Sequence, residues 1–248
     1  MFEPTIKFRE VTRSTNQDIK DLIERNKLTN NELPELYTIL AGFQEAGRGQ
    51  GTNRWFSDAG ENILATIYFR PPISAAEQFR FNQFFSISIR QFLLKFVPEV
   101  EIKWPNDIYV RGKKIAGILI EHSVCGDRLS HTIAGIGLNV NQADFPPALP
   151  NPVSLFQLTG KRYDVKALTH EIVTKCAENY EKLQKKHFEE LNEEYLGCLY
   201  RKDVFASYLI NNQMVCAKIT GTDRYGRLLL VDRDGNAHCC CLKEIVFQ

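Results

Sequence analysis

Residues 100–140 read VEIKWPNDIYVRGKKIAGILIEHSVCGDRLSHTIAGIGLNV. Short runs rich in β-branched and aromatic residues (EIKW, DIYV, KIAGILIEH and HTIAGIGLNV) alternate here with turn residues at Arg111-Gly112 and Cys125-Gly126-Asp127. Connections this short can join only antiparallel neighbours, because a parallel pair needs a long crossover. The segment therefore predicts an antiparallel sheet.

The sequence before this segment alternates between strand and helix patterns. Strand patterns cover Thr5–Phe8, Tyr37–Gln44 and Ile63–Phe69, and helical patterns cover Asn16–Lys27 and Ala76–Phe96. The apolar positions of the last of these form one stripe, so we expect a long helix packed on the sheet.

The sequence after the segment predicts one long helix and a small β module. Pro-rich residues 145–153 interrupt the pattern, and a helix then begins with Asp164 as N-cap and ends near Gly197. Beyond residue 200 the pattern changes to short strand candidates separated by turns, at Gln213–Ile219, Leu228–Val231 and Ala237–Leu242.

Composition narrows the class of protein. The chain has 248 residues, 44% hydrophobic and 25% charged, as in ordinary globular proteins. Its 31 basic and 30 acidic residues argue against a dedicated nucleic-acid or membrane-surface binder. We find no signal-peptide pattern and no membrane-spanning apolar run, so we expect a cytoplasmic protein. Seven scattered cysteines predict reduced thiols, mostly in the core, rather than a disulfide framework.

A glycine-rich segment, AGRGQGTNRW, covers residues 46–55. Its glycines allow the backbone to approach a ligand closely, and Arg48 and Arg54 can bind a phosphate or a carboxylate. The segment matches neither the Rossmann nor the Walker A pattern. An ordinary structural loop is the alternative, because glycine is common in any turn.

The segment KWPND, residues 103–107, is followed across a turn by Lys113 and Lys114. A two-residue hairpin at Arg111-Gly112 would set Asp107 opposite Ala116, with Asp107 and Lys114 on the same face. A carboxylate and an ammonium on one face suit a site that neutralises phosphate and holds a magnesium ion or a polar ligand. A surface ion pair is the alternative.

Three further features are weaker. Gly135 and Gly137 leave one face of a strand bare, either for a flat ligand or for close packing against a helix. Arg13-Ser14-Thr15-Asn16 offers polar groups at a helix start, for capping or for ligand binding. His238 and the cysteines at 239–241 do not favour a zinc site, because adjacent strand residues point to opposite faces.

Taken in order, five blocks of the chain strongly resemble those of biotin protein ligases: Ser14-Thr15-Asn16, Gln44 with GRGQGTNRW (47–55), KWPNDIY (103–109), KIAGIL (114–119) and GIGLNVN (135–141). The resemblance covers essentially the whole chain. It implies an α+β fold, in which residues 1–200 form a mixed, largely antiparallel sheet with helices packed on one face, as in class II synthetase-like biotin/lipoate ligase domains. Residues 201–248 would form a small Src-homology-3-like β-barrel. The chain also looks like the short form of the family, without the N-terminal DNA-binding domain.

The resemblance also implies roles for individual residues. Lys114, Asp107 and Arg48 would be catalytic, with Lys114 bridging the biotin carboxylate and the α-phosphate, and Asp107 orienting Lys114 or a metal ion. The biotin site would comprise Ser14, Thr15, Asn16, Gln44, Arg48, Gly49, Gln50, Lys114, Gly117, Leu119, Gly135 and Gly137. The ATP site would comprise Arg54, Trp55, Lys103, Asn106, Asp107 and Asn139. Many relatives carry further basic residues where this chain has Gln50, Gly51 and Thr52.

The implied activity is that of a biotin–[acetyl-CoA-carboxylase] ligase. It would use ATP and magnesium to form biotinyl-5'-adenylate and transfer biotin to a lysine of a biotin carboxyl carrier protein or domain. The alternatives are a lipoate or octanoyl protein ligase, a non-catalytic sensor of biotin or its adenylate acting through a protein partner, and a nucleotide-binding scaffold. We expect no nucleic-acid or membrane partner. A homodimer could form through an exposed edge strand near Gly135–Val140.

Overall fold

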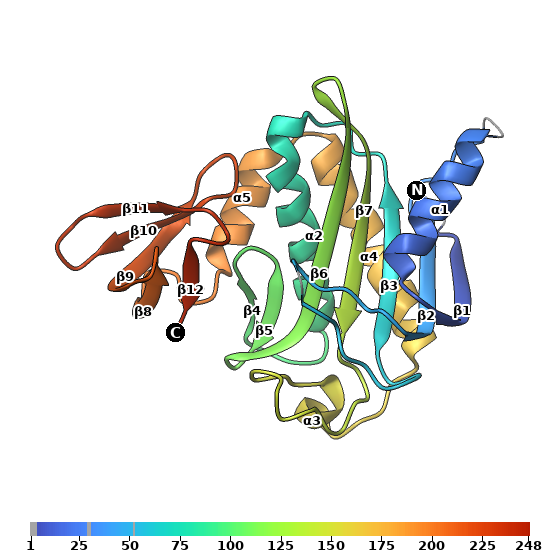
Figure 1. Ribbon diagram of the computed structural model, residues 1–248, viewed down its shortest axis with the longest axis horizontal. Coiled ribbons are helices and arrows are strands. Elements are labelled where there is room, and N and C mark those ends of the chain that lie inside the picture. Colours follow the sequence, from blue (N-terminus) through green and yellow to red (C-terminus); the bar gives the residue numbers. More distant parts are fainter. Residues whose placement is uncertain (1–3, 29–30, 52) are drawn as a thin grey trace.

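Two β-sheets and the helices packed on them make up the computed structural model, which describes residues 4–28, 31–51 and 53–248 (Figure 1). Within these ranges the larger sheet has seven strands in the order β1-β2-β3-β7-β6-β5-β4. β1 and β2 pair parallel and the other neighbours antiparallel, which confirms the mixed, largely antiparallel sheet. The strands are β1 Ile6–Thr12, β2 Thr38–Gln44, β3 Ile63–Phe69, β4 Val100–Lys103, β5 Asp107–Val110, β6 Lys113–Cys125 and β7 Arg128–Leu138.

The turn between β5 and β6 is the predicted two-residue hairpin. Arg111 and Gly112 have φ of 49° and 74°, and positive φ at both positions is what a type I′ turn requires. The predicted register is wrong, however. A β-bulge sets Ile108, rather than Asp107, opposite Ala116, while Tyr109 still pairs with Lys114. A bulge of this kind bends the strand locally and re-aims its side chains.

Helices cover both faces of the large sheet. α2 (Gln78–Leu93), which follows a 3₁₀ turn at Ala75–Glu77, and α4 (Val165–Gln184) pack on one face, as predicted. Their aromatic side chains meet the sheet at Phe69, whose ring lies 5.1 Å from that of Phe81. α1 (Thr15–Leu28) lies on the opposite face, so the expectation that helices pack on one face only is wrong. That face also carries apolar side chains, and Ile39, Tyr68 and Ile133 bury Ile19 of α1.

The helix predicted from Asp164 to Gly197 is two helices. Asp164 caps α4 as predicted, and its side chain accepts hydrogen bonds from the backbone N–H groups of Lys166 and Ala167. The chain then turns at Lys186, where φ is 57°, and α5 (Phe188–Gly197) begins. The apolar stripe continues across the break because both helices bury it against the same core, so periodicity alone did not reveal the turn. A short α3 (Leu155–Thr159) precedes them.

The second sheet is antiparallel, in the order β11-β10-β9-β8-β12. Its strands are β8 Phe205–Ile210, β9 Gln213–Thr222, β10 Leu228–Asp232, β11 Ala237–Cys240 and β12 Ile245–Phe247. The sequence analysis missed β8 and β12, and the domain boundary at residue 200 stays a prediction. The Trp104 indole N–H donates to the Gly226 carbonyl at 2.8 Å, which fixes a turn of this sheet beside the loop between β4 and β5.

Two further predictions were wrong. Residues 135–138 are not at an edge, because β7 pairs with both β3 and β6, and the edges of the large sheet are β1 and β4. The basis offered for a homodimer therefore fails. The cysteines are free thiols, but Cys125, Cys216, Cys239 and Cys241 are exposed and only the other three are buried.

Candidate functional site

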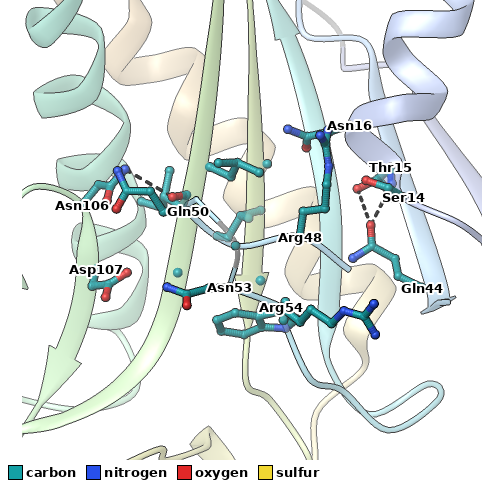
Figure 2. A pocket seen from close by; sticks show the side chains of 18 of the residues that line it. Ser14, Thr15, Asn16, Gln44, Arg48, Gln50, Asn53, Arg54, Asn106 and Asp107 are labelled. Atoms are coloured by element: carbon teal, nitrogen blue, oxygen red, sulfur yellow. Dashed lines mark hydrogen bonds between the residues drawn. The ribbon is translucent and has the colours of Figure 1, made fainter. Parts of the chain in front are cut away.

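A pocket of about 760 Å³, including its open mouth, lies over β6 and β7 on the α1 side of the sheet (Figure 2). It brings together every predicted site residue except Lys103 and Asn139. Its lining comprises Ser14, Thr15, Asn16, Gln44, Arg48, Gly49, Gln50, Asn53, Arg54, Trp55, Ala65, Asn106, Asp107, Lys114, Gly117, Ile118, Leu119, Gly135, Ile136 and Gly137.

One end of the pocket is built from neutral polar groups at the start of α1. The backbone N–H and the hydroxyl of Thr15 both donate to Gln44 Oε1, at 2.7 and 3.1 Å. The hydroxyl of Thr66, fully buried on β3, donates to Asn16 Oδ1 at 2.6 Å. These bonds hold the side chains of α1 against β2 and β3, so the donors and acceptors of Thr15, Asn16 and Gln44 are fixed in place.

The other end carries an ion pair. Lys114 Nζ lies 2.7 Å from Asp107 Oδ2, with both side chains about one-third exposed (31% each). The two residues come from adjacent strands, on either side of the hairpin turn at residues 111–112. Asp107 and Lys114 therefore do lie on the same face, as predicted. The strand register from which this was predicted was wrong.

Lys103 lies outside the pocket. Its Nζ donates to the Tyr109 hydroxyl at 3.1 Å and lies 4.9 Å from the centre of the Phe247 ring on β12. Burial lowers the pKa of Lys103, and the neighbouring Asp107 charge only partly offsets that effect. Its role in nucleotide binding stays a prediction.

The glycine-rich segment is a small hairpin, residues 47–55. Gly49 N–H donates to the Asn53 carbonyl at 2.8 Å, and Trp55 N–H donates to the Gly47 carbonyl at 3.0 Å. Gly51 has φ of 65°, which favours glycine. Thr52 lies outside the described residues.

Two different side chains pack on the face of β7 that Gly135 and Gly137 leave free of side chains. A Cβ at Gly137 would lie 2.3 Å from the Trp55 indole, and a Cβ at Gly135 would lie 2.3 Å from Asn16 Oδ1. Gly137 therefore accommodates a flat ring from the chain itself, and Gly135 accommodates the start of α1. Gly117 also lies under the indole, at 2.8 Å.

Asn139 lines a neighbouring pocket, which shares four residues with the first: Asn53, Arg54, Trp55 and Lys114. Its Nδ2 donates to the Val153 carbonyl at 3.0 Å. Asn139 Oδ1 and Trp55 Nε1 are both buried without a hydrogen-bond partner in the described part of the chain. A buried acceptor and a buried donor left unpaired beside a pocket can be satisfied by ordered water or by a polar ligand.

The sequence analysis missed Glu121, which lies on β6 and contacts two residues of the first pocket, Asn16 and Arg48. Its carboxylate accepts hydrogen bonds from Asn16 Nδ2 at 2.8 Å and Lys20 Nζ at 2.6 Å, and it pairs with Arg48 at 3.4 Å. Burial acts to raise the pKa of Glu121, but these hydrogen bonds and positive charges together lower it. The signal available was a charged residue directly after the apolar run IAGILI, residues 115–120.

No cluster of three or more His, Cys, Asp or Glu side chains among the described residues could hold a metal ion. Asp107 is the one carboxylate among the residues that line the pocket. A Mg²⁺ ion would fit here if phosphate oxygens and water supplied most of its ligands, which is its usual habit. In the described ranges, no helix has the length and apolar character to cross a bilayer.

The chain is similar in sequence to known biotin ligases. Residues 8–139 match the model of the biotin/lipoate A/B protein ligase family. The chain is 32% identical over 218 residues to the bifunctional ligase/repressor BirA of Bacillus subtilis, an alignment that covers 85% of this chain and 63% of that protein. It is 34% identical over 133 residues to the biotin–[acetyl-CoA-carboxylase] ligase of Paracoccus denitrificans, covering 51% of this chain and 55% of that protein.

The fold is similar to that of the biotin protein ligase from Aquifex aeolicus, solved in complex with biotin and ATP. The TM-score is 0.78 at 22% identity, and the superposition covers 98% of each chain. The biotin protein ligase from Leishmania major, solved with biotin, superposes with a TM-score of 0.66 at 19% identity, over 97% of this chain and 99% of that chain.

Proposed function

Because the chain belongs to the biotin/lipoate A/B protein ligase family, we propose that it joins biotin to a protein in two steps. In the first, the biotin carboxylate attacks the α-phosphate of ATP, giving biotinyl-5'-adenylate and pyrophosphate. In the second, a lysine amine of a carrier protein attacks the activated carbonyl and releases AMP.

The observation that carries this proposal is that neutral polar side chains and the Lys114–Asp107 ion pair lie at opposite ends of the pocket. At one end the neutral side chains of Ser14, Thr15 and Gln44 suit an uncharged polar head, with the Arg48–Glu121 pair beside them. The opposite end carries Lys114 within 2.7 Å of Asp107. Biotin has this character, with a neutral ureido group at one end and a carboxylate at the other. The buried unpaired atoms of Asn139 and Trp55 support a nucleotide beyond Lys114.

The basic side chains of the pocket can reduce the repulsion between the two negatively charged substrates of the first step. A carboxylate and a triphosphate repel each other, so the site has to neutralise both and align them. Lys114 and Arg48 both line the pocket, and Arg54 lines the part shared with the nucleotide side. When bound, magnesium would offset phosphate charge, with Asp107 as a candidate protein ligand.

The second step needs the acceptor lysine as a neutral amine. Asp107 is the carboxylate nearest to Lys114 and could accept the proton as the amine attacks. The acceptor that we propose is a biotin carboxyl carrier protein or domain. The chain spans 63% of the length of its Bacillus relative.

ATP–pyrophosphate exchange tests the first step. Purified protein with magnesium should exchange label with biotin but not with lipoate or without an acid. Exchange with lipoate alone would assign the chain to the lipoate branch of the family. Absence of exchange with either acid would contradict a ligase and favour a sensor or a scaffold.

Lys114→Ala should reduce biotin-dependent exchange by at least about 100-fold, the usual effect of removing one group that stabilises developing charge. Lys113→Ala is the matched control, because Lys113 is the neighbouring residue, is exposed, and does not line the pocket. Equal exchange by a folded Lys114→Ala variant and the control would remove Lys114 from the mechanism.

A further inference from the structure

Glu121 joins three parts of the molecule through one carboxylate. Its Oε1 accepts from Lys20 Nζ on α1 at 2.6 Å, and its Oε2 accepts from Asn16 Nδ2 at 2.8 Å and from Arg48 Nη2 at 3.4 Å. Glu121 itself lies on β6, a central strand of the large sheet. The proposed mechanism gives it no part.

Of the three contacts of Glu121, the one with Arg48 links β6 to the hairpin 47–55. Among the ion pairs of the described residues, it alone joins this hairpin to the sheet. Figure 2 shows the Arg48 side chain running from the hairpin toward Asn16, along the wall of the pocket. The ion pair therefore joins the hairpin to β6 beside the pocket.

The contact also orients the guanidinium. Only Nη2 meets Glu121, so the other donors of the planar group remain available to an anion in the pocket. A side chain that Glu121 already holds in place loses less conformational entropy when it binds a ligand.

We propose that Glu121 is a positioning residue: it anchors Arg48, and through Arg48 the hairpin 47–55, over the pocket. The proposal rests on the proposed function. Biotinyl-adenylate is a mixed anhydride, and water that reaches its carbonyl releases biotin and AMP without transfer. A hairpin held over the pocket excludes that water until the acceptor amine arrives.

Glu121→Gln removes the charge and retains a carbonyl oxygen that can accept from Asn16. Glu171→Gln is the matched control, because Glu171 forms a comparable exposed pair with Lys95 at 3.1 Å on α4, which packs on the other face of the sheet. Thermal unfolding of both variants checks that the fold is kept.

The first measurement is hydrogen exchange of the ligand-free protein. The backbone N–H groups of Gly49 and Trp55 are bonded within the hairpin, and in Glu121→Gln they should exchange up to about five-fold faster, the scale of a partly exposed ion pair. The amides of β6 and the whole Glu171→Gln variant should be unchanged. Unchanged exchange at residues 47–55 in Glu121→Gln would overturn the anchoring role.

The second measurement is the number of AMP molecules formed per biotin transferred. The ratio should rise about two- to five-fold in Glu121→Gln and stay constant in Glu171→Gln. In an Arg48→Ala background, Glu121→Gln should add nothing, because its effect passes through Arg48. Additive effects would overturn the proposal. Absence of biotin-dependent AMP formation in the unmodified protein would refute the proposed function, while hydrogen exchange would still decide the anchor.

Discussion

Replacing Gly135 with alanine tests how tightly the start of α1 is packed on the pocket floor. The added Cβ would lie 2.3 Å from Asn16 Oδ1, roughly 1 Å inside van der Waals contact. Asn16 is only 4% exposed, and its side chain is held by Thr66 at 2.6 Å and Glu121 at 2.8 Å. Relieving the clash therefore has to break at least one of these hydrogen bonds.

The expected loss combines two effects. Overpacking a core position costs about 1–3 kcal/mol, and leaving a buried polar group unpaired costs about 1–3 kcal/mol. Partial relaxation reduces their sum, so we expect Gly135→Ala to lower the free energy of unfolding by about 2–4 kcal/mol. Displacing Asn16 should also raise the KM for biotin, because Thr15 adjoins it in the pocket.

Urea unfolding and biotin-dependent exchange measure the two effects. Gly197→Ala is the control, since a Cβ there meets no atom within 4 Å at the end of α5. Alanine at this helical position should raise stability, by up to about 1 kcal/mol, rather than lower it. A Gly135→Ala protein with the stability and the KM of the unmodified chain would refute the packing argument.

Two further predictions concern stability. Gly226 and Gly235 share a φ of 86°, but only a Cβ at Gly226 would meet another side chain, 2.2 Å from the Phe79 ring. Gly226→Ala should therefore lose about 1–3 kcal/mol more of the free energy of unfolding than Gly235→Ala in urea unfolding. Equal losses would contradict the packing of Gly226 of the second sheet against Phe79. Burial lowers the pKa of His122 from 6.5 to about 4, so on acidification the unfolded chain binds a proton before the folded chain does. Stability should fall as the pH drops from 6.5 toward 4, by up to about 3 kcal/mol, and an unchanged slope in His122→Gln would exclude His122 as the cause.

Local patterns predicted most of the fold because they act over a few residues. The turn at Arg111-Gly112 was predicted from its turn residues between two strand patterns, and its positive φ values confirm it. The stripe of α2 follows from helical spacing. Prediction failed where a single residue changed the outcome. The bulge after Ile108 and the turn at Lys186 leave the apolar pattern nearly intact, so periodicity does not report them.

The candidate site was predicted in the same uneven way. Residues within recognisable blocks, such as Arg48 and Lys114, do line the pocket. Glu121 was missed because its partners come from α1 and the hairpin, and nothing near it in the sequence marks them.

Residues close together in the chain were enough to predict most of the short strands, the turn at Arg111-Gly112, the start of α4 at Asp164 and the motifs that resemble a ligase. The packing of α1 on the face opposite α2 could not be predicted in this way, and neither could the contact of Asn16 with Glu121 across 105 residues of sequence. Such contacts depend on how the sheet is assembled, because a strand pattern specifies which residues share a face and leaves open what will pack against that face.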